Sequence, residues 1–171
     1  MQALIKAFWE VALWRRSPAD LPDSAALLGL VGLAYAALSA LQSWMIFGTT
    51  ALLGRTLADL ALLALPLWVL LAIARRRARY RQTLTALLGA GVVLSPFVIV
   101  LLALKTPAES AYPMALVVWG GSVAVVLWYL FAVGFILRAA LDTGVFTGVA
   151  IALAYVAGSS AALSALFPAG A

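Results

Sequence analysis

Two oppositely charged residues stand near the start of an apolar stretch that covers residues 56–74. Arg55 precedes this stretch and Asp59 lies inside it, and their spacing of four residues places them on one face of a helix. A lone carboxylate inside a membrane is costly, and acids at such positions can contact protons or substrates. We expect Asp59 to pair with Arg55; contact with a proton or substrate is the alternative. Arg138 and Asp142 repeat the spacing and are also expected to pair.

A dense group of arginines follows the same stretch. Guanidinium groups can bind anionic lipid headgroups or an acidic surface of a partner protein. Arginines that flank a membrane span also hold its end on the cytoplasmic side, without any more specific function. We expect this anchoring role; a docking site for a cytoplasmic partner or an anionic lipid is the alternative. The group, termed the arginine cluster, consists of Arg75, Arg76, Arg77, Arg79 and Arg81.

The chain offers few side chains for covalent chemistry. It contains no cysteine and no histidine, which excludes disulfides, thiol nucleophiles and the usual ligands of zinc and haem. The GxSxG, HExxH and phosphate-binding-loop motifs are absent as well. We therefore expect no enzyme activity, no catalytic residue, no metal site and no cofactor. The net charge of +5 does not predict nucleic-acid binding, because the basic residues flank apolar stretches.

Five apolar stretches must position these charged residues. Hydrophobic residues make up 66% of the chain and charged residues 10%, unlike the composition of a soluble domain. Each stretch is close to or longer than the roughly 20 residues that a helix needs to cross a bilayer. None shows the alternation of apolar and polar residues that a barrel strand requires. The sequence predicts an all-α fold, a multi-pass transmembrane helical bundle that forms one domain over residues 1–171. The expected spans are 25–47, 56–74, 84–104, 114–137 and 145–167.

The residues before the first span are expected to lie at the membrane surface. Polar residues recur at every fourth position as Gln2, Lys6 and Glu10, which predicts a short interfacial amphipathic helix within residues 1–16. Recognition of another protein is the alternative role for this helix. Residues 17–24 are rich in turn formers and make the expected linker, and either of its last two residues can cap the first span.

The distribution of positive charge predicts the orientation of the chain. Short loops rich in arginine stay in the cytoplasm. With the arginine cluster on that side, nine of the eleven lysine and arginine residues are cytoplasmic. The N-terminus is then cytoplasmic and the C-terminus lies outside. The alanine-, leucine- and arginine-rich composition is compatible with a bacterial inner membrane.

Two rows of small residues predict close packing between helices, because small side chains let backbones approach. We expect both rows to pack within the bundle; association of two copies of the chain is the alternative. The rows are Gly32, Ala36 and Ala40 in the first span and Gly144, Gly148 and Ala152 at the last.

Three passages share a recognisable pattern. Residues 14–22 (WRRSPADLP) end an amphipathic stretch, residues 80–88 (YRQTLTALL) carry the basic loop into the third span, and residues 127–129 (LWY) lead into the glycine-rich last span. Together they resemble the Yip1-like family of five-span membrane proteins, particularly its bacterial members. The resemblance implies the five-span topology. Eukaryotic relatives are associated with vesicle trafficking and small-GTPase interaction, but this chain lacks their long hydrophilic N-terminal domain.

Two functions fit these observations. The first is a non-enzymatic accessory or scaffold protein that engages another membrane protein, a second copy of itself or anionic lipid. The alternative is a small transporter or lipid-handling protein with a polar site near Asp59. In that case Pro66 and Pro96 would kink neighbouring spans and open a cleft between them. The alternative predicts a polar cavity that reaches Asp59.

Overall fold

The computed structural model describes residues 2–15, 17–49, 51–108 and 112–167. Within these ranges the fold is all-α, with six α-helices and two short 3-10 segments. Five of the described helices are long and apolar enough to cross a membrane, as predicted, and a short helix precedes them. The elements are α1 Gln2–Ala12, η1 Pro18–Asp20, α2 Ala25–Phe47, α3 Leu52–Ile73, η2 Arg77–Arg79, α4 Tyr80–Ala108, α5 Tyr112–Leu141 and α6 Val145–Leu166.

The helices match the predicted spans in number and differ from them in length. α2 has the predicted bounds, whereas α3 begins at Leu52 and α4 and α5 extend past the predicted spans at both ends. Apolar composition marks the part of a helix that hydrocarbon surrounds. A helix continues beyond it until caps or water satisfy its free backbone groups, so composition underestimates its length.

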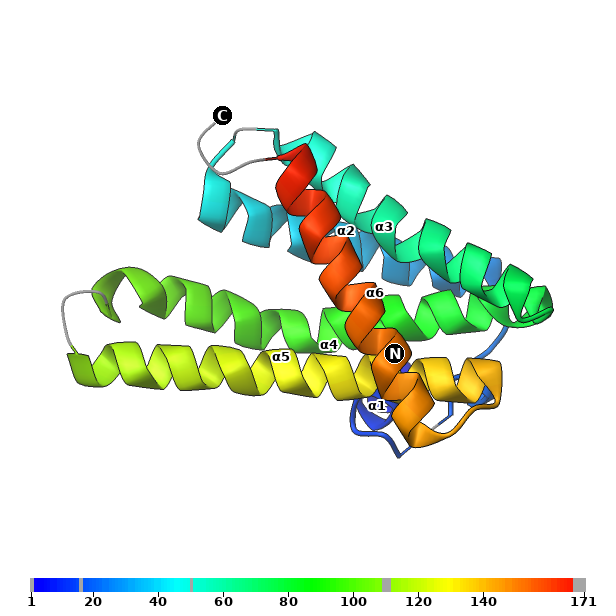
Figure 1. Cartoon of the computed structure of the whole chain (residues 1–171). Helices are drawn as coiled ribbons and strands as arrows, with labels where there is room; N and C mark the ends of the chain where they lie inside the picture. Colours follow the sequence, from blue (N-terminus) through cyan, green and yellow to red (C-terminus); the bar gives the residue numbers. More distant parts are fainter. Residues whose placement is uncertain (1, 16, 50, 109–111, 168–171) are drawn as a thin grey trace.

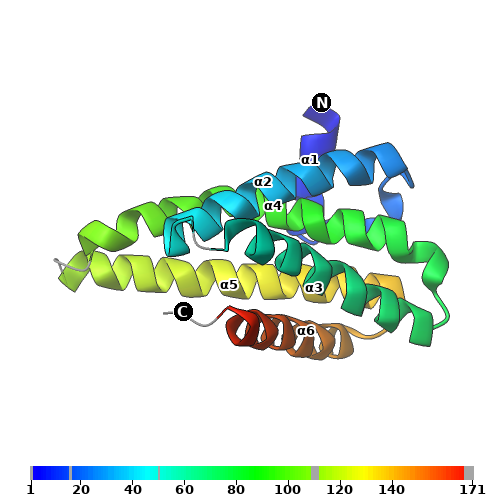
Figure 2. The same ribbon diagram turned by 90° about the horizontal axis from the view of Figure 1, so that it is seen from above.

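The helices form two antiparallel pairs and one crossing helix (Figure 1). α2 pairs with α3 and α4 pairs with α5, while α2 also packs along α4. α6 packs on α5 and crosses to the start of α3 (Figure 1). Figure 2 shows that α1 runs steeply across the other helices. We term the end with the arginine cluster the basic end, and the opposite end, where α2 meets α3 and α6 ends, the far end.

The side chains pack most densely toward the basic end. One cluster of buried apolar residues draws on all six helices. Its fully buried members include Leu67, Leu71, Leu87, Val133 and Leu137. These residues lie in the halves of α3, α4 and α5 that are nearer to the arginine cluster. The bundle is therefore filled with apolar side chains at its basic end.

The short helix α1 packs against the bundle with its apolar face. Phe8 is buried, and the indole of Trp128 in α5 donates to a carbonyl oxygen at the end of α1 at 2.8 Å. On the opposite face, Nζ of the exposed Lys6 lies 3.9 Å from Oε1 of Glu10. The predicted polar stripe begins at Gln2, whose side chain lies outside the described residues. α1 is thus an amphipathic helix whose apolar face is covered by the long helices.

Caps order the linker between α1 and α2. Ser17 caps η1, and its backbone amide donates to the carboxylate of Asp20 at 3.1 Å. Ser24 caps α2, as expected, by accepting the amide hydrogen of Leu27 at 3.3 Å. Leu21 between them is buried against the bundle. The linker therefore fixes the start of the first span.

Candidate functional site

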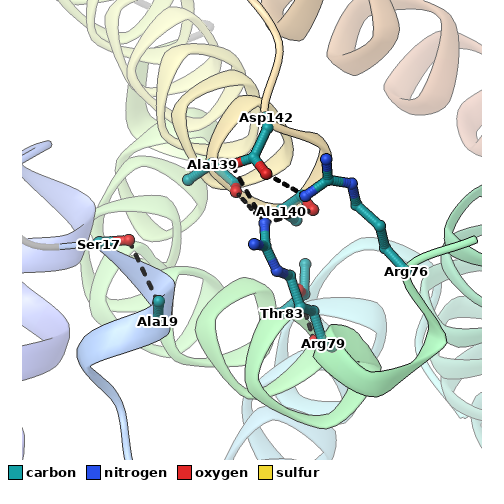
Figure 3. Close-up of polar contacts among 8 residues, drawn as sticks. All are labelled: Ser17, Ala19, Arg76, Arg79, Thr83, Ala139, Ala140 and Asp142. Atoms are coloured by element: carbon teal, nitrogen blue, oxygen red, sulfur yellow. Dashed lines mark hydrogen bonds and ion pairs between the residues drawn. The ribbon is translucent and has the colours of Figure 1, made fainter. Parts of the chain in front are cut away.

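The arginine cluster makes contacts within the chain at the basic end (Figure 3). Arg76 and Arg79 both pair with Asp142, and Nη1 of Arg79 lies 3.2 Å from Oδ1 of Asp142. Nη1 of Arg79 also donates to the carbonyl oxygens of Ala139 and Ala140 at 3.1 and 3.2 Å. A helix end leaves such carbonyls without partners. These arginines therefore join the connection between α3 and α4 to the end of α5.

The other members of the cluster have separate surroundings. Nε of Arg81 lies 3.2 Å from the carboxylate of Asp23, and the guanidinium of Arg77 lies 5.2 Å from the ring centroid of Trp68. Arg75 is exposed and adopts a left-handed backbone conformation with φ of 58°. Four of the five arginines thus have partners within the chain. The anchoring role and the docking site both stay predictions.

The carboxylate of Asp142 is the centre of the contacts at the basic end. Hydrogen bonds from Arg79 and Arg76 lower the pKa of Asp142 below its ordinary value, because they favour the charged form. The side chain of Asp142 is 54% exposed, so solvent screens these interactions.

The structure corrects the expected pairing of Arg138 with Asp142. No ion pair between described residues joins them. Asp142 follows the last residue of α5 in a left-handed conformation with φ of 52°, so the helical spacing of four residues does not extend to it. The guanidinium of Arg138 lies 4.9 Å from the ring centroid of Phe135 instead.

Asp59 lies in the far half of the bundle and accepts two hydrogen bonds from α2. The hydroxyl of Tyr35 donates to Oδ2 of Asp59 at 2.9 Å, and the hydroxyl of Ser39 donates to the same oxygen at 2.8 Å. Because Tyr35 and Ser39 are four residues apart, one face of α2 supplies both donors. Among the described residues, no hydrogen bond or ion pair reaches the other carboxylate oxygen, Oδ1.

The structure also corrects the expected pairing of Arg55 with Asp59. No ion pair within the described ranges joins the two side chains. Nη2 of Arg55 donates to the carbonyl oxygen of Phe167 at 3.1 Å, and the guanidinium lies 3.5 Å from the ring centroid of Phe47. The carbonyl that follows the end of α6 lacks a helical partner and draws the guanidinium toward the far end. Hydroxyl groups of α2 donate to one oxygen of Asp59 instead.

Asp59 lines two adjoining cavities, one near the middle of the bundle and one toward its far end. The inner cavity has a volume of about 260 Å³ and is also lined by Tyr129 and Tyr155. The outer cavity has a volume of about 470 Å³ and reaches Arg55 and Phe167 at the far end. Both cavities thus reach Asp59, and their walls are mostly apolar. The residues shared by both cavities are Tyr35, Gln42, Asp59, Ser95, Ser160 and Leu163.

A glycine in α4 sets the position of the Tyr35 ring. A Cβ atom at Gly91 would lie 2.5 Å from Cε2 of Tyr35, so the absence of a side chain lets the ring pack against α4. Val31 and Leu27, one and two turns earlier on the same face of α2, are buried in the core. The apolar face of α2 therefore ends in a tyrosine whose hydroxyl is directed to Asp59.

Tyrosine hydroxyls also satisfy the backbone around Pro66 in α3. Pro66 lacks the amide that would bond the carbonyl oxygen of Leu62, and its ring crowds the preceding turn, where polar partners from other helices help to satisfy the backbone. The hydroxyl of Tyr155 donates to the carbonyl oxygen of Leu63 at 2.6 Å, and that of Tyr80 donates to the carbonyl oxygen of Ala64 at 3.3 Å. Neighbouring helices thus supply the partners that lipid cannot.

The row of small residues at the last span packs against α5. Gly148 and Ala152 are buried, and a Cβ atom at Gly148 would lie 2.6 Å from the carbonyl oxygen of Gly134. Gly144 is the residue before α6, and a Cβ atom there would meet nothing within 4 Å. The close approach of α6 to α5 therefore depends on Gly148 and Ala152, without Gly144.

The row in the first span contributes less to packing than expected. Gly32, Ala36 and Ala40 are half-buried, and a Cβ atom at Gly32 would meet nothing within 4 Å. α2 packs on α4 through the adjacent face, which carries Leu27 and Val31. Larger apolar side chains fill the space between these two helices, so the row of small residues is not the surface through which α2 packs on α4.

The sequence identified Asp59 as a candidate site residue but did not identify the side chains around it. Tyr35, Tyr129 and Tyr155 each lie in the middle of an apolar stretch. Tyrosine in membrane proteins is enriched at the interfaces, and a buried hydroxyl needs a hydrogen-bond partner. Tyrosines in the middle of apolar stretches therefore could have indicated from the sequence that a polar site lies inside the bundle.

Comparisons with protein families, with characterised proteins and with solved structures found no match for this chain. The resemblance to the Yip1-like family accordingly stays a prediction. The described helices include five segments that are long and apolar enough to span a membrane.

Proposed function

We propose that this protein is a small transporter or lipid-handling protein whose ligand binds in the cavities around Asp59. One observation carries the proposal. A carboxylate with one oxygen that no other described residue contacts by a hydrogen bond or ion pair lies where a cavity that reaches the far end meets an inner cavity. Ionisable groups that face a cavity inside a membrane mark the pathways of substrates and ions. Asp59 is the proposed principal contact of the ligand.

The packing of the basic end supports the same proposal. Buried leucine, valine and isoleucine side chains fill that end, whereas the inner cavity lies near the middle of the bundle and the outer cavity toward the far end. A central site that is accessible from one side and closed on the other corresponds to one state of an alternating-access transporter. The proposal therefore includes a second state, in which the basic end opens.

The proposal also includes an orientation and a location. The positive-inside rule places the arginine cluster in the cytoplasm and the far end on the outside. The cavities would then receive ligand from outside the cell, in a membrane that we propose to be a bacterial inner membrane.

Reconstitution into liposomes tests the proposal. One set of vesicles is supplied with radiolabelled amines, amino acids and quaternary ammonium compounds, and a second set contains a fluorescent phospholipid whose exchange between leaflets is followed. We expect uptake or exchange above that of protein-free vesicles, and Asp59→Asn should abolish it. Asp142→Asn, the same chemical change at the basic end, should retain it. Activity that is absent, or equal in wild type and Asp59→Asn, contradicts the proposal.

The accessory or scaffold role receives less support from the geometry. Four arginines of the cluster already contact the chain itself, and the face around Gly148 is already used by α5. The role stays a prediction. Its test is purification in mild detergent, from which a stoichiometric partner or a second copy of the chain would be recovered.

A further inference from the structure

We propose, on the premise of the binding function above, that the ligand is a zwitterion. Its substituted ammonium group would bind Asp59 among the tyrosines of the inner cavity, and its anionic group would bind Arg55 in the outer cavity. Two oppositely charged side chains that line one cavity without pairing with each other carry this proposal.

The inner cavity has the composition of an ammonium site. Tyr35 and Ser39 hold Oδ2 of Asp59, which leaves Oδ1 without a hydrogen bond among the described residues. Tyr129 and Tyr155 line the same cavity, and most of the remaining wall is apolar. Aromatic rings attract cations through their negative faces, and cages of such rings recognise methylated ammonium groups. The apolar wall suits the methyl groups of the same ligand.

Arg55 presents the opposite charge to the outer cavity. Its Nη2 donates to the carbonyl oxygen of Phe167, and among the described residues no hydrogen bond uses its buried Nε or its Nη1. Arg55 lines the outer cavity, which Asp59 lines as well. Arg55 and Asp59 are one helical turn apart on α3, so a single small ligand in the outer cavity reaches both residues.

Charge balance favours a zwitterion over a simple ion. Asp59 and Arg55 are together neutral. A simple cation would pair with Asp59 and leave Arg55 without an anionic partner, and a simple anion would pair with Arg55 and leave Asp59 without a cationic one. A ligand with both charges satisfies both side chains at once.

Binding to the full chain in phosphatidylglycerol nanodiscs tests this proposal, because that lipid carries no ammonium group. Glycine betaine is compared by calorimetry with choline, which lacks the carboxylate, and with 3,3-dimethylbutanoate, which lacks the positive charge. Dihexanoylphosphatidylcholine represents a lipid headgroup. We expect betaine or the phosphatidylcholine to bind at least about tenfold more tightly than choline and dimethylbutanoate. Betaine binding identifies a free solute as the source, and binding of the phosphatidylcholine alone identifies a headgroup.

Substitutions assign each end of the ligand. Asp59→Asn should remove the preference for betaine over dimethylbutanoate, and Arg55→Gln should remove the preference for betaine over choline. Tyr129→Phe keeps the ring and should retain binding, whereas Tyr129→Leu should weaken it by about tenfold. Asp142→Asn at the basic end is the control and should bind like wild type.

Equal binding of all probes, or binding of none, overturns the zwitterion proposal. The comparison of probes uses the wild-type chain, so it tests the ligand class even where a variant does not fold. The transport function is tested separately from the ligand class. Zwitterion binding without uptake or lipid exchange in vesicles contradicts the transport function and supports the ligand class, whereas uptake of other solutes without zwitterion binding overturns the ligand class alone.

Discussion

The hydroxyl of Tyr35 in α2 lies 2.9 Å from Oδ2 of Asp59 in α3, in the wall shared by the two cavities. Together with Ser39, this bond orients the carboxylate from one side. No hydrogen bond or ion pair from another described residue reaches the opposite oxygen, Oδ1. The position of the Tyr35 ring in turn depends on Gly91, which leaves room for it against α4.

Loss of the Tyr35 hydroxyl should destabilise the bundle modestly. Tyr35→Phe keeps the ring on Gly91 and removes the bond to Asp59. Because hydrogen bonds between membrane helices contribute on average about 0.6 kcal/mol and at most about 1.7 kcal/mol, we expect a loss in this range. Unfolding by titration with a denaturing detergent measures it. Tyr129→Phe removes no hydrogen bond found among the described residues, and an equal loss in this control would contradict the prediction.

An alanine at Gly148 should separate α6 from α5. The added methyl group would lie 2.6 Å from the carbonyl oxygen of Gly134, and overpacking of this kind costs about 1–3 kcal/mol. The same unfolding titration measures the loss. Gly32→Ala is the matched control, because its added methyl group meets nothing within 4 Å and should be neutral or stabilising. Similar behaviour of the two variants would show that the contact between α5 and α6 is looser than described.

A glycine in place of Arg75 should stabilise the chain. Arg75 ends α3 in a left-handed conformation that costs a residue with a side chain about 1 kcal/mol or more, and its exposed side chain makes no contact found in the described structure. We expect a gain of about 1 kcal/mol for Arg75→Gly. Asp142→Gly relieves the same conformation but also removes the partner of Arg76 and Arg79, so its gain should be smaller or reversed. A larger gain at Asp142 would refute this explanation.

Acid should weaken the contacts at the basic end. The pKa of Asp142 is lowered in the folded chain, so its contribution to stability is present above the pKa of the unfolded chain. That contribution is lost as the pH falls through the lowered pKa of the folded state. We expect wild type to be more stable than Asp142→Asn at neutral pH and the difference to shrink toward zero in acid. A difference that stays constant with pH would argue against the ion pairs.

The sequence predicted the spans because the hydrocarbon core of a membrane requires apolar side chains along the whole length of a span. About 20 apolar residues meet this requirement whichever helices lie beside them. The ends of α3, α4 and α5 were harder to predict, because they depend on partners such as Arg79, which binds carbonyl groups of α5 from another helix.

The candidate site was predicted in part, since Asp59 was identified and its partners were not. Spacing along one helix suggested Arg55, but the two side chains found partners elsewhere in the fold. Arg55 contacts Phe167, 112 residues away, and Asp59 contacts Tyr35, 24 residues away. A single sequence does not reveal which faces of different helices meet, and those meetings decide how a charge inside the bundle is satisfied.

The most direct test of a cavity that reaches Asp59 from the far end is the reactivity of an introduced thiol. The native chain contains no cysteine, so Ser160→Cys places one thiol in the shared wall of both cavities, and Leu153→Cys places one on an exposed face of α6 outside them. A thiol must ionise to react, which requires water rather than lipid. With a membrane-impermeant methanethiosulfonate added on the side of the far end, we predict rapid modification at position 160 and little at position 153. An unreactive thiol at position 160, or equal rates at both positions, would contradict the cavity.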